Sequence, residues 1–309
     1  MDRERPRERV AEARLGAGGA KVPYPIRIRR LEVVGRQSIS PTMLRLTLGG
    51  QDLVGFESHS VVDEHVKIVF PDPGGGLRVP EPNGSMVRWP HPMPPTRDYT
   101  VRRYDPTAGE LDLDVVLHAG GLASEWAARV GPGEPVWVAG PPAGLAVPEH
   151  YDRYLLAGDT TALPAIARWV EGMPSAARGW VFVEVAGAAE EIDLAAPEGV
   201  TVTWLHRDGV AAGRSDVLAR AVRGVDIPAG ESVYVWVAGE AGSIKPLRRW
   251  VRDELRLPPA DCSITGYWKV GLAMFDEDHN PGDGEDHGHG HGHGHGHGHG
   301  HGHDEAAAV

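Results

Sequence analysis

Residues 97–102, which read RDYTVR, combine the side chains that a flavin nucleotide needs from a protein. Such a cofactor requires a cation for its pyrophosphate, an aromatic or backbone wall along the ring, and hydrogen bonds at the ring edge. Arg97 and Tyr99 lie two residues apart, so a strand would present them on one face. Together with Asp98 and Thr100 they form the first candidate FAD-binding group. On its own, this pattern is equally compatible with an exposed strand that carries ordinary charges.

Residues 118–126, HAGGLASEW, could bind the phosphates of the same cofactor. They follow a predicted strand and open a short helix predicted over 124–129. Glycines let the backbone approach a ligand closely, and the free amides of a helix N-terminus bind phosphate. We expect Ser124 to cap this helix, a role that competes with a direct phosphate contact. The alternative is a plain glycine turn with His118 in a structural role; the candidate residues are His118, Gly120, Gly121, Ala123, Ser124 and Trp126.

A second nucleotide site is predicted at residues 155–164, LLAGDTTALP, where a strand, a tight turn and a helix start follow one another. This arrangement is typical of sites for dinucleotide phosphates, and Pro164 is tolerated in the first helical turn. The spacing is not G-x-G-x-x-G, and a capped turn without a ligand is the alternative. The candidate NAD(P)-binding residues, here and at the end of a later strand, are Gly158, Asp159, Thr160, Thr161, Ala238, Gly239 and Glu240.

Arg207 follows a strand predicted over residues 200–205. A cation at this point could bind the 2′-phosphate of NADPH, so we expect NADPH to be preferred over NADH. The alternative is that Arg207 forms a salt bridge with Asp208 or Asp216.

Two adjacent aromatic residues, Tyr267 and Trp268, end the last predicted strand. Aromatic rings at the carboxyl end of a strand can stack on a flavin or shield it from solvent. The alternative is an aromatic plug that covers the edge of the sheet.

The elements that would position these groups fall into two sets. Between residues 25 and 148 the sequence predicts six short strands separated by Gly and Pro clusters, and residues 71–95 form a long loop rich in these residues. Short strands without a helical period are typical of an antiparallel barrel. The strands are predicted over residues 26–34, 43–48, 65–70, 98–104, 111–117 and 135–139.

From residue 151 onward, apolar strands alternate with helices, which predicts a parallel sheet with ligands at the carboxyl ends of its strands. The strands are predicted over 154–157, 180–185, 200–205 and 233–238, and the helices over 162–171, 215–223 and 243–255. The expected fold is therefore a flavin-binding antiparallel β-barrel (23–148) followed by an α/β NAD(P)-binding domain (149–271).

The two ends of the chain have a different composition from its middle. Residues 1–22 alternate Arg and Glu, and we expect a mobile arm or at most a short frayed helix. Residues 272–309 form a low-complexity tail that we expect to be disordered. Neutral imidazole suits Ni²⁺, Zn²⁺ and Cu²⁺, so the tail is a candidate metal binder through His287, His289, His291, His293, His295, His297, His299, His301 and His303.

Composition excludes several other classes of function. The formal net charge is −12, and eight acids with no Lys or Arg follow Gly271, which leaves −4 for the rest of the chain. This balance argues against nucleic acid as a partner. The single cysteine, Cys262, excludes an internal disulfide and a cysteine-ligated iron–sulfur cluster. No run of 18 apolar residues and no leader-like segment occurs, so we expect a cytoplasmic protein without a membrane span.

Taken in order, these motifs resemble the siderophore-interacting protein (ferric-siderophore reductase) family over residues 22–271. The family's R-x-Y-T-x-R strand is matched at 97–102, and its W-x-A-G-E-A and G-Y-W-K-x-G segments are matched at 236–241 and 266–271. The turn at His118 departs from the family pattern, because Leu122 stands where proline is usual and the spacing is one residue shorter. In the segment 155–166, Thr160 replaces the usual glutamate.

The resemblance implies a ferredoxin-reductase layout in which NAD(P)H passes a hydride to FAD and the reduced flavin passes single electrons to Fe(III) in a siderophore. Siderophore oxygens hold ferric iron better than ferrous iron, so reduction releases the metal. No protein general base is needed. Ferric siderophores are often anionic, and the candidate basic patch is Lys67, Arg249 and Lys269, each of which could instead be an ordinary surface cation.

Two alternatives to this function remain. One is a flavin-linked or ferredoxin-linked oxidoreductase that uses another acceptor. The other is a metal buffer that acts through the histidine tail.

Overall fold

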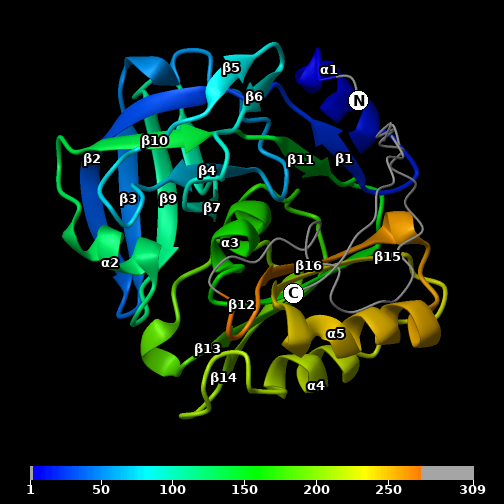
Figure 1. Cartoon of the computed structure of the whole chain (residues 1–309). Helices are drawn as coiled ribbons and strands as arrows, with labels where there is room; N and C mark the ends of the chain where they lie inside the picture. Colours follow the sequence, from blue (N-terminus) through cyan, green and yellow to red (C-terminus); the bar gives the residue numbers. More distant parts are fainter. Residues whose placement is uncertain (1–2, 273–309) are drawn as a thin grey trace, which may run out of the picture.

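The computed structural model describes residues 3–272 of the chain. Its first half contains a seven-stranded antiparallel sheet with the strand order β7-β4-β10-β2-β3-β9-β8 (Figure 1). The strands are β2 (Ile28–Ser40), β3 (Met43–Gly49), β4 (His65–Val69), β7 (Thr96–Thr100), β8 (Arg103–Asp105), β9 (Glu110–Val116) and β10 (Pro135–Ala139). The expected strand over 98–104 is thus divided into β7 and β8.

Apolar residues alternate along the strands of this sheet, and their side chains form the core that the sheet surrounds. Leu46 and Leu48 of β3 and Leu111 and Leu113 of β9 are fully buried in one cluster with Ile68 of β4. Strands that alternate in this way place every second side chain inside. The long connection between β4 and β7 is mostly loop, as expected, but it carries the short hairpin β5 (Glu81–Asn83) and β6 (Met86–Arg88).

The aspartates of β9 do not face open solvent. Asp112 and Asp114 are both buried. Arg103 donates to Asp112 at 2.7 Å, and Arg45 donates to Asp114 through two bonds of 2.7 and 2.9 Å. A buried carboxylate is tolerated when a cation and hydrogen bonds compensate it, so this face of β9 is covered by paired charges.

Residues 3–23 include a helix and a strand, whereas the sequence led us to expect a mobile arm or at most a short frayed helix over residues 1–22. It forms α1 (Pro6–Arg14) and β1 (Ala20–Pro23), and β1 pairs with β11 (Ala143–Ala146). Pro6 and Val10, four residues apart on one face of α1, are buried, and Val10 packs in a cluster with Val22, Tyr24, Val61 and Ala146. The many Arg and Glu residues on the other face hide this short apolar stripe in the sequence.

The second half is a five-stranded parallel sheet with the order β14-β13-β12-β15-β16. Its strands are β12 (Arg153–Asp159), β13 (Gly179–Val185), β14 (Val200–His206), β15 (Val233–Glu240) and β16 (Cys262–Trp268). The chain leaves β12 toward β13 and β14 and then returns to β15 on the other side of β12. The order therefore reverses between β12 and β15, which is where such sheets bind ligands.

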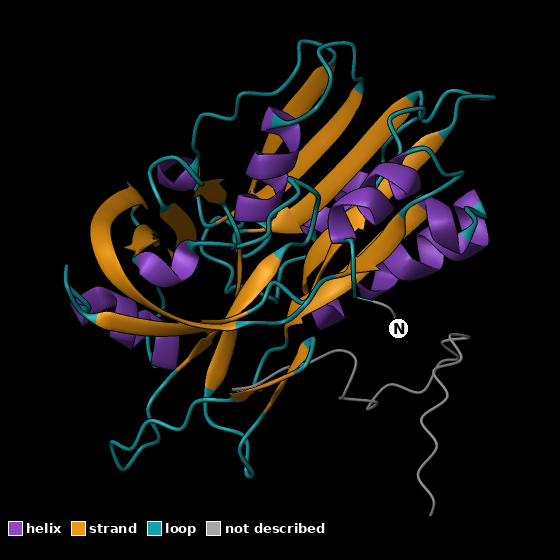
Figure 2. Cartoon of the chain, turned by 90° about the horizontal axis from the view of Figure 1, so that it is seen from above, coloured by secondary structure: helices purple, strands orange, loops and turns teal. Residues whose placement is uncertain are grey.

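Helices cover both faces of this sheet (Figures 1 and 2). The helix α3 (Leu163–Glu171) packs on the face toward the barrel, in a cluster that also contains Met43 and Val62 from the barrel. The helices α4 (Val217–Arg223) and α5 (Ala241–Arg249) pack on the opposite face. Within the described residues, no helix has both the length and the apolar character that a membrane crossing requires.

Candidate flavin and nucleotide site

The strand β7 presents Arg97 and Tyr99 on one face. Register pairs Tyr99 with Val66 and Arg97 with Ile68, and both partners are buried in the barrel core. Tyr99 packs against that core, and burial raises its pKa above the usual range, so its hydroxyl stays protonated at neutral pH. The Arg97 guanidinium donates to the Thr96 carbonyl at 2.7 Å. Among residues 3–272 it has no carboxylate partner, so its charge remains available to an anion.

Asp98 and Thr100 lie on the other face of β7. Register pairs Asp98 with Lys67 and Thr100 with His65. The Lys67 ammonium donates to the Asp98 carboxylate at 2.7 Å. A candidate substrate cation and a candidate flavin residue thus neutralise each other, and the structure does not bring Asp98 together with Arg97 and Tyr99.

The turn over residues 118–121 differs from the predicted one in the cap of the helix that follows it. The helix α2 spans Leu122–Arg129, begins two residues earlier than expected and has Gly121 at its N-cap. Ser124 is buried, and its Oγ accepts a 2.6 Å hydrogen bond from the His118 backbone N–H, so the expectation that Ser124 caps the helix is wrong. Within the described chain no side chain caps α2. Its first-turn amides therefore remain available to a phosphate.

His118 and Trp126 support this turn from two sides. The His118 ring lies against Gly121, where an added Cβ would lie 2.3 Å from the ring Cε1. The ring of Trp126 packs edge to face on the ring of Phe70, with 5.4 Å between the ring centroids, and it contacts the same barrel core as Tyr99. The helix after the turn and β7 therefore pack against the same barrel core. A free cation, an aromatic wall and uncapped helix amides form a donor set that fits a flavin nucleotide.

Asp159, at the end of β12, joins the carboxyl ends of three strands. Its Oδ1 accepts from the Thr161 N–H at 2.8 Å and from the Thr161 hydroxyl at 2.5 Å. Its Oδ2 accepts from the Glu240 N–H at 2.9 Å and from Trp268 Nε1 at 2.8 Å. Asp159 therefore ties together the carboxyl ends of β12, β15 and β16.

Two glycines allow this close packing. A Cβ on Gly158 would lie 2.4 Å from the Ala162 Cβ, and Gly239, at φ 153°, would place one 2.9 Å from Asp159. Glu240 caps α5 by accepting from the Ser243 N–H at 2.7 Å, and it also accepts from the Val270 N–H at 3.1 Å. The carboxylate of Glu240 is therefore occupied by backbone groups.

Arg207 forms a salt bridge with neither Asp208 nor Asp216, the two partners that the sequence suggested. Its Nη1 lies 3.8 Å from Glu184 Oε1, and its Nε donates to the Val210 carbonyl at 3.3 Å. Burial raises the pKa of Glu184, and the Arg207 charge opposes that shift. The alternative of a salt bridge to Asp208 or Asp216 is not borne out, and the contact with Glu184 instead holds the end of β14 against β13.

Tyr267 and Trp268 contact different parts of the molecule. The Tyr267 hydroxyl donates to Asp63 Oδ1 at 2.5 Å, and Trp236 Nε1 donates to Asp63 Oδ2 at 3.2 Å. Tyr267 therefore faces the barrel. Trp268 bonds to Asp159, and its ring edge approaches Gly213 in the loop after β14. Of the two aromatics, Tyr267 is the one at the domain interface.

The candidate basic patch is divided. Arg249 lines a surface groove with Arg223, Lys245 and Trp250 on the face that α4 and α5 cover. Lys67 belongs to the barrel, on the opposite side of the parallel sheet, and Lys269 follows β16. The histidines from His287 to His303 lie outside the described residues. Among those described, no three His, Cys, Asp or Glu side chains gather as a metal site.

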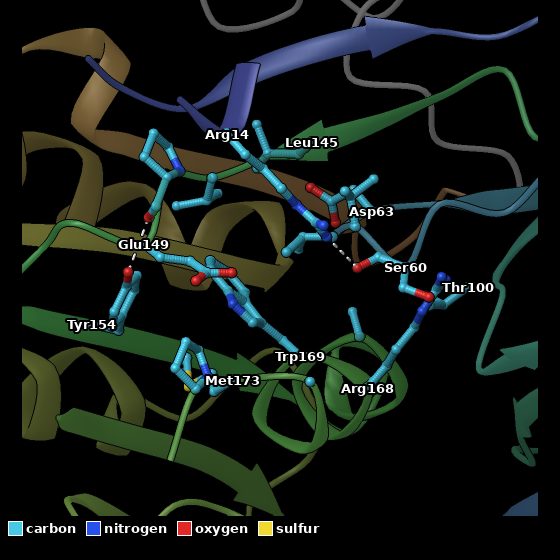
Figure 3. A pocket seen from close by; sticks show the side chains of 17 residues that line it. Arg14, Ser60, Asp63, Thr100, Leu145, Glu149, Tyr154, Arg168, Trp169 and Met173 are labelled. Atoms are coloured by element: carbon cyan, nitrogen blue, oxygen red, sulfur yellow. Dashed lines mark hydrogen bonds between the residues drawn. The ribbon is translucent and has the colours of Figure 1, made fainter. Parts of the chain in front are cut away.

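The domain interface contains residues that no sequence motif singled out. A small cavity of about 60 Å³ lies between the loop before β4, the end of β7 and α3 (Figure 3). Asp63, Thr100, Arg168 and Trp169 line it, and Arg14 of α1 reaches its rim, where it donates to the Ser60 carbonyl at 3.1 Å. Asp63 lies outside every predicted element, so no periodicity could reveal it.

Comparison with known protein families decides the relationship. The siderophore-interacting FAD-binding domain matches residues 32–145, and the siderophore-interacting protein family matches residues 151–271. The chain belongs to the siderophore-interacting protein family. The predicted layout of a barrel followed by a parallel sheet is confirmed as a ferredoxin-reductase-like fold.

Relatives within the family cover most of the chain. Ferric vibriobactin reductase ViuB from Vibrio cholerae is 37% identical over 262 residues, which is 83% of this chain and 94% of that protein. The NADPH-dependent ferric-chelate reductase of Escherichia coli is 34% identical over 252 residues, covering 80% of this chain and 95% of that one. A siderophore utilization protein from T. fusca superposes with a TM-score of 0.79 at 40% identity, covering 84% and 99%.

Proposed function

We propose that this siderophore-interacting protein is an NAD(P)H-dependent, FAD-containing reductase that releases iron from ferric siderophores. The observation that carries the proposal is that Arg97, which has no carboxylate partner among the described residues, belongs to β7, and that the residue after β7, Val101, is bonded to α3, the helix that begins after the turn at Asp159. The names of the relatives, which include a ferric vibriobactin reductase and a ferric-chelate reductase, support the substrate class.

In this proposal each side chain has a binding or orienting task. Arg97 and the first amides of α2 hold the pyrophosphate, and Tyr99 forms the wall of the flavin ring. Thr100 lies on the opposite face of β7, where it lines the domain interface. FAD held in this way would supply the chemistry that links hydride transfer to one-electron transfer. The turn that follows Asp159 receives the phosphates of the nicotinamide nucleotide.

The substrate is ferric iron held by hard oxygen ligands. Ferrous iron is larger in size and lower in charge, so the same ligands hold it less well after one electron arrives. The protein therefore needs to bring the chelate near the flavin and does not need to supply a general base. Of the candidate cations, Lys269 directly follows β16 at the carboxyl edge of the sheet. Lys67 is paired with Asp98 in the barrel.

NADPH is the proposed donor, supported by the relative that is named NADPH-dependent. The contact of Arg207 with Glu184 argues that this arginine holds the end of β14 and does not itself select the 2′-phosphate. Ferredoxin as an electron donor is the competing proposal.

An absorption spectrum of the purified protein followed by an acceptor screen tests the function. We expect a flavin spectrum and NADPH oxidation that depends on ferric siderophores, with Fe(II) trapped by a colourless ferrous chelator. A protein without flavin, or one that reduces quinones or ferredoxin while ferric siderophores remain inert, contradicts the proposal.

We also propose that the nine histidines from His287 to His303 bind Ni²⁺, Zn²⁺ or Cu²⁺ without taking part in hydride transfer. Calorimetry with Ni²⁺ on the full chain and on a chain that ends at Asp276 is the test. Equal uptake by both chains places the metal site elsewhere, and loss of reductase turnover in the shorter chain assigns the tail to the enzyme.

A further inference from the structure

The helix α3 connects the two proposed cofactor sites. It begins directly after the turn formed by residues 159–162, where the nucleotide phosphates are expected, with Pro164 in its first turn. Its C-terminal half lies between the parallel sheet and the barrel, facing the end of β7 (Figures 1 and 3). A displacement of this helix would therefore move one site relative to the other.

Arg168 attaches the middle of α3 to the barrel through three acceptors. Its Nη1 donates to the Val101 carbonyl at 2.6 Å, and its Nη2 donates to the Ser58 hydroxyl at 2.8 Å and to Glu64 Oε2 at 2.5 Å. Val101 is the residue directly after Thr100. The planar fork of arginine can reach acceptors in several fixed directions, which a lysine ammonium on a flexible stem does less well.

Glu64 is a fully buried carboxylate that the barrel has otherwise satisfied. It accepts from the Tyr24 hydroxyl at 2.9 Å, from the Ser58 hydroxyl at 2.7 Å and from the His59 backbone N–H at 2.7 Å. These contacts fix the orientation of the carboxylate before Arg168 reaches it. The anchor on the barrel side is therefore rigid, and Arg168 supplies the compensating charge that a buried carboxylate requires.

A second attachment lies one turn further along α3. Arg102, the residue after Val101, donates to Glu171 through two bonds of 2.8 and 2.5 Å. Residues 168 and 171 are three apart and share a face of the helix. Two consecutive residues after the flavin strand are thus bonded to two positions on one face of α3, which restrains both sliding and rotation of the helix.

We propose that Arg168, assisted by the Arg102–Glu171 pair, is a positioning residue that fixes the nucleotide turn relative to β7 and thereby sets the distance between nicotinamide and flavin. This inference rests on the proposed FAD and NAD(P)H sites. Hydride transfer requires the reacting atoms to be held about 3–3.5 Å apart, and small displacements are costly. Two domains joined by a modest interface otherwise move relative to each other.

The test compares R168K and E171Q with the matched control R153Q. Arg153 also forms an arginine–glutamate pair, with Glu231, but at the opposite end of β12. Each holoprotein is mixed anaerobically with NADPH, and stopped-flow absorbance gives the limiting rate of flavin reduction and the long-wavelength charge-transfer band. Titrations give the dissociation constants of FAD and NADPH.

We expect R168K to reduce the limiting rate roughly tenfold and to weaken the charge-transfer band, while both dissociation constants change by less than about twofold. E171Q should show a smaller change in the same two quantities, and R153Q should show none. Unchanged rates and bands in both R168K and E171Q overturn the inference, as does a rate that falls only in proportion to lost binding. If R168K does not fold, E171Q alone decides. A parent that binds no FAD would instead contradict the proposed function.

Discussion

The hydroxyl of Tyr267 donates a 2.5 Å hydrogen bond to the carboxylate of Asp63, which joins the last strand of the parallel sheet to the loop before the barrel strand β4. Asp63 has a positive φ of 60°, a conformation that Asp and Asn tolerate better than most residues. We expect Y267F to lower the free energy of unfolding by about 1.5–3 kcal/mol, the usual value for a hydrogen bond to a charged group. Urea unfolding measures this, and a variant as stable as the parent contradicts the assignment.

The same tyrosine predicts an alkaline limit to stability. Burial raises the pKa of Tyr267, with the Asp63 charge adding to the shift, and burial also raises the pKa values of Tyr24 and Tyr234. A group with a raised pKa in the folded state contributes its full stability below its unfolded pKa, about 10 for Tyr, and loses it as the pH rises further. The melting temperature should therefore fall above about pH 10, and less steeply in Y267F. Equal slopes in the two proteins contradict the prediction.

We expect Arg97 to strengthen the binding of FAD. Its guanidinium has no carboxylate partner among the described residues, so R97A should weaken FAD binding by about 1.5–3 kcal/mol without unfolding the barrel. The control is R88A, because Arg88 is an exposed barrel arginine paired with Glu81 on the β5–β6 hairpin. Fluorescence titration of the apoprotein with FAD measures both. Equal affinity in R97A and R88A removes Arg97 from the site.

We expect the turn over residues 118–121 to tolerate no side chain at Gly121. An added Cβ would meet the His118 ring at 2.3 Å, so G121A must displace that ring and should weaken FAD binding by about 1–3 kcal/mol. G131A is the matched control, since its Cβ would meet Glu134 at an ordinary 3.6 Å. The double variant H118A/G121A removes the clash and should recover part of the affinity. A G121A protein that behaves like G131A would show that the ring does not support the turn.

The parts of the two candidate sites that could be predicted are those formed by residues close together in the sequence. Alternation along a strand places Arg97 and Tyr99 on one face, and a strand followed by a helix start marks the turn after Asp159. The start of α2 was not predictable in this way, because Ser124 resembles a cap but its hydroxyl accepts from His118 instead. The roles of Asp159 and Arg168 depend on acceptors and donors 67 to 110 residues away, and such distant pairs leave no periodic signal.

We expect Arg207 to contribute to the stability of the protein and not to its choice between NADPH and NADH. R207A would leave Glu184 buried without its cation, which should cost about 3 kcal/mol of stability. Its effect on kcat/KM should be equal for NADPH and NADH. The double variant E184Q/R207A should restore much of the stability. A selective loss of NADPH efficiency in R207A would instead assign the arginine to the 2′-phosphate.

The most direct test of the proposed function is a single-turnover experiment with the FAD-loaded protein. The flavin is first reduced anaerobically with NADPH, then mixed with a ferric siderophore and a ferrous chelator while the flavin spectrum is followed. Our account predicts that the oxidised flavin spectrum returns as two ferrous ions appear for each reduced flavin, because a two-electron carrier gives single electrons to iron. A flavin that stays reduced in the presence of the ferric siderophore, but is oxidised by a quinone or a ferredoxin, contradicts it.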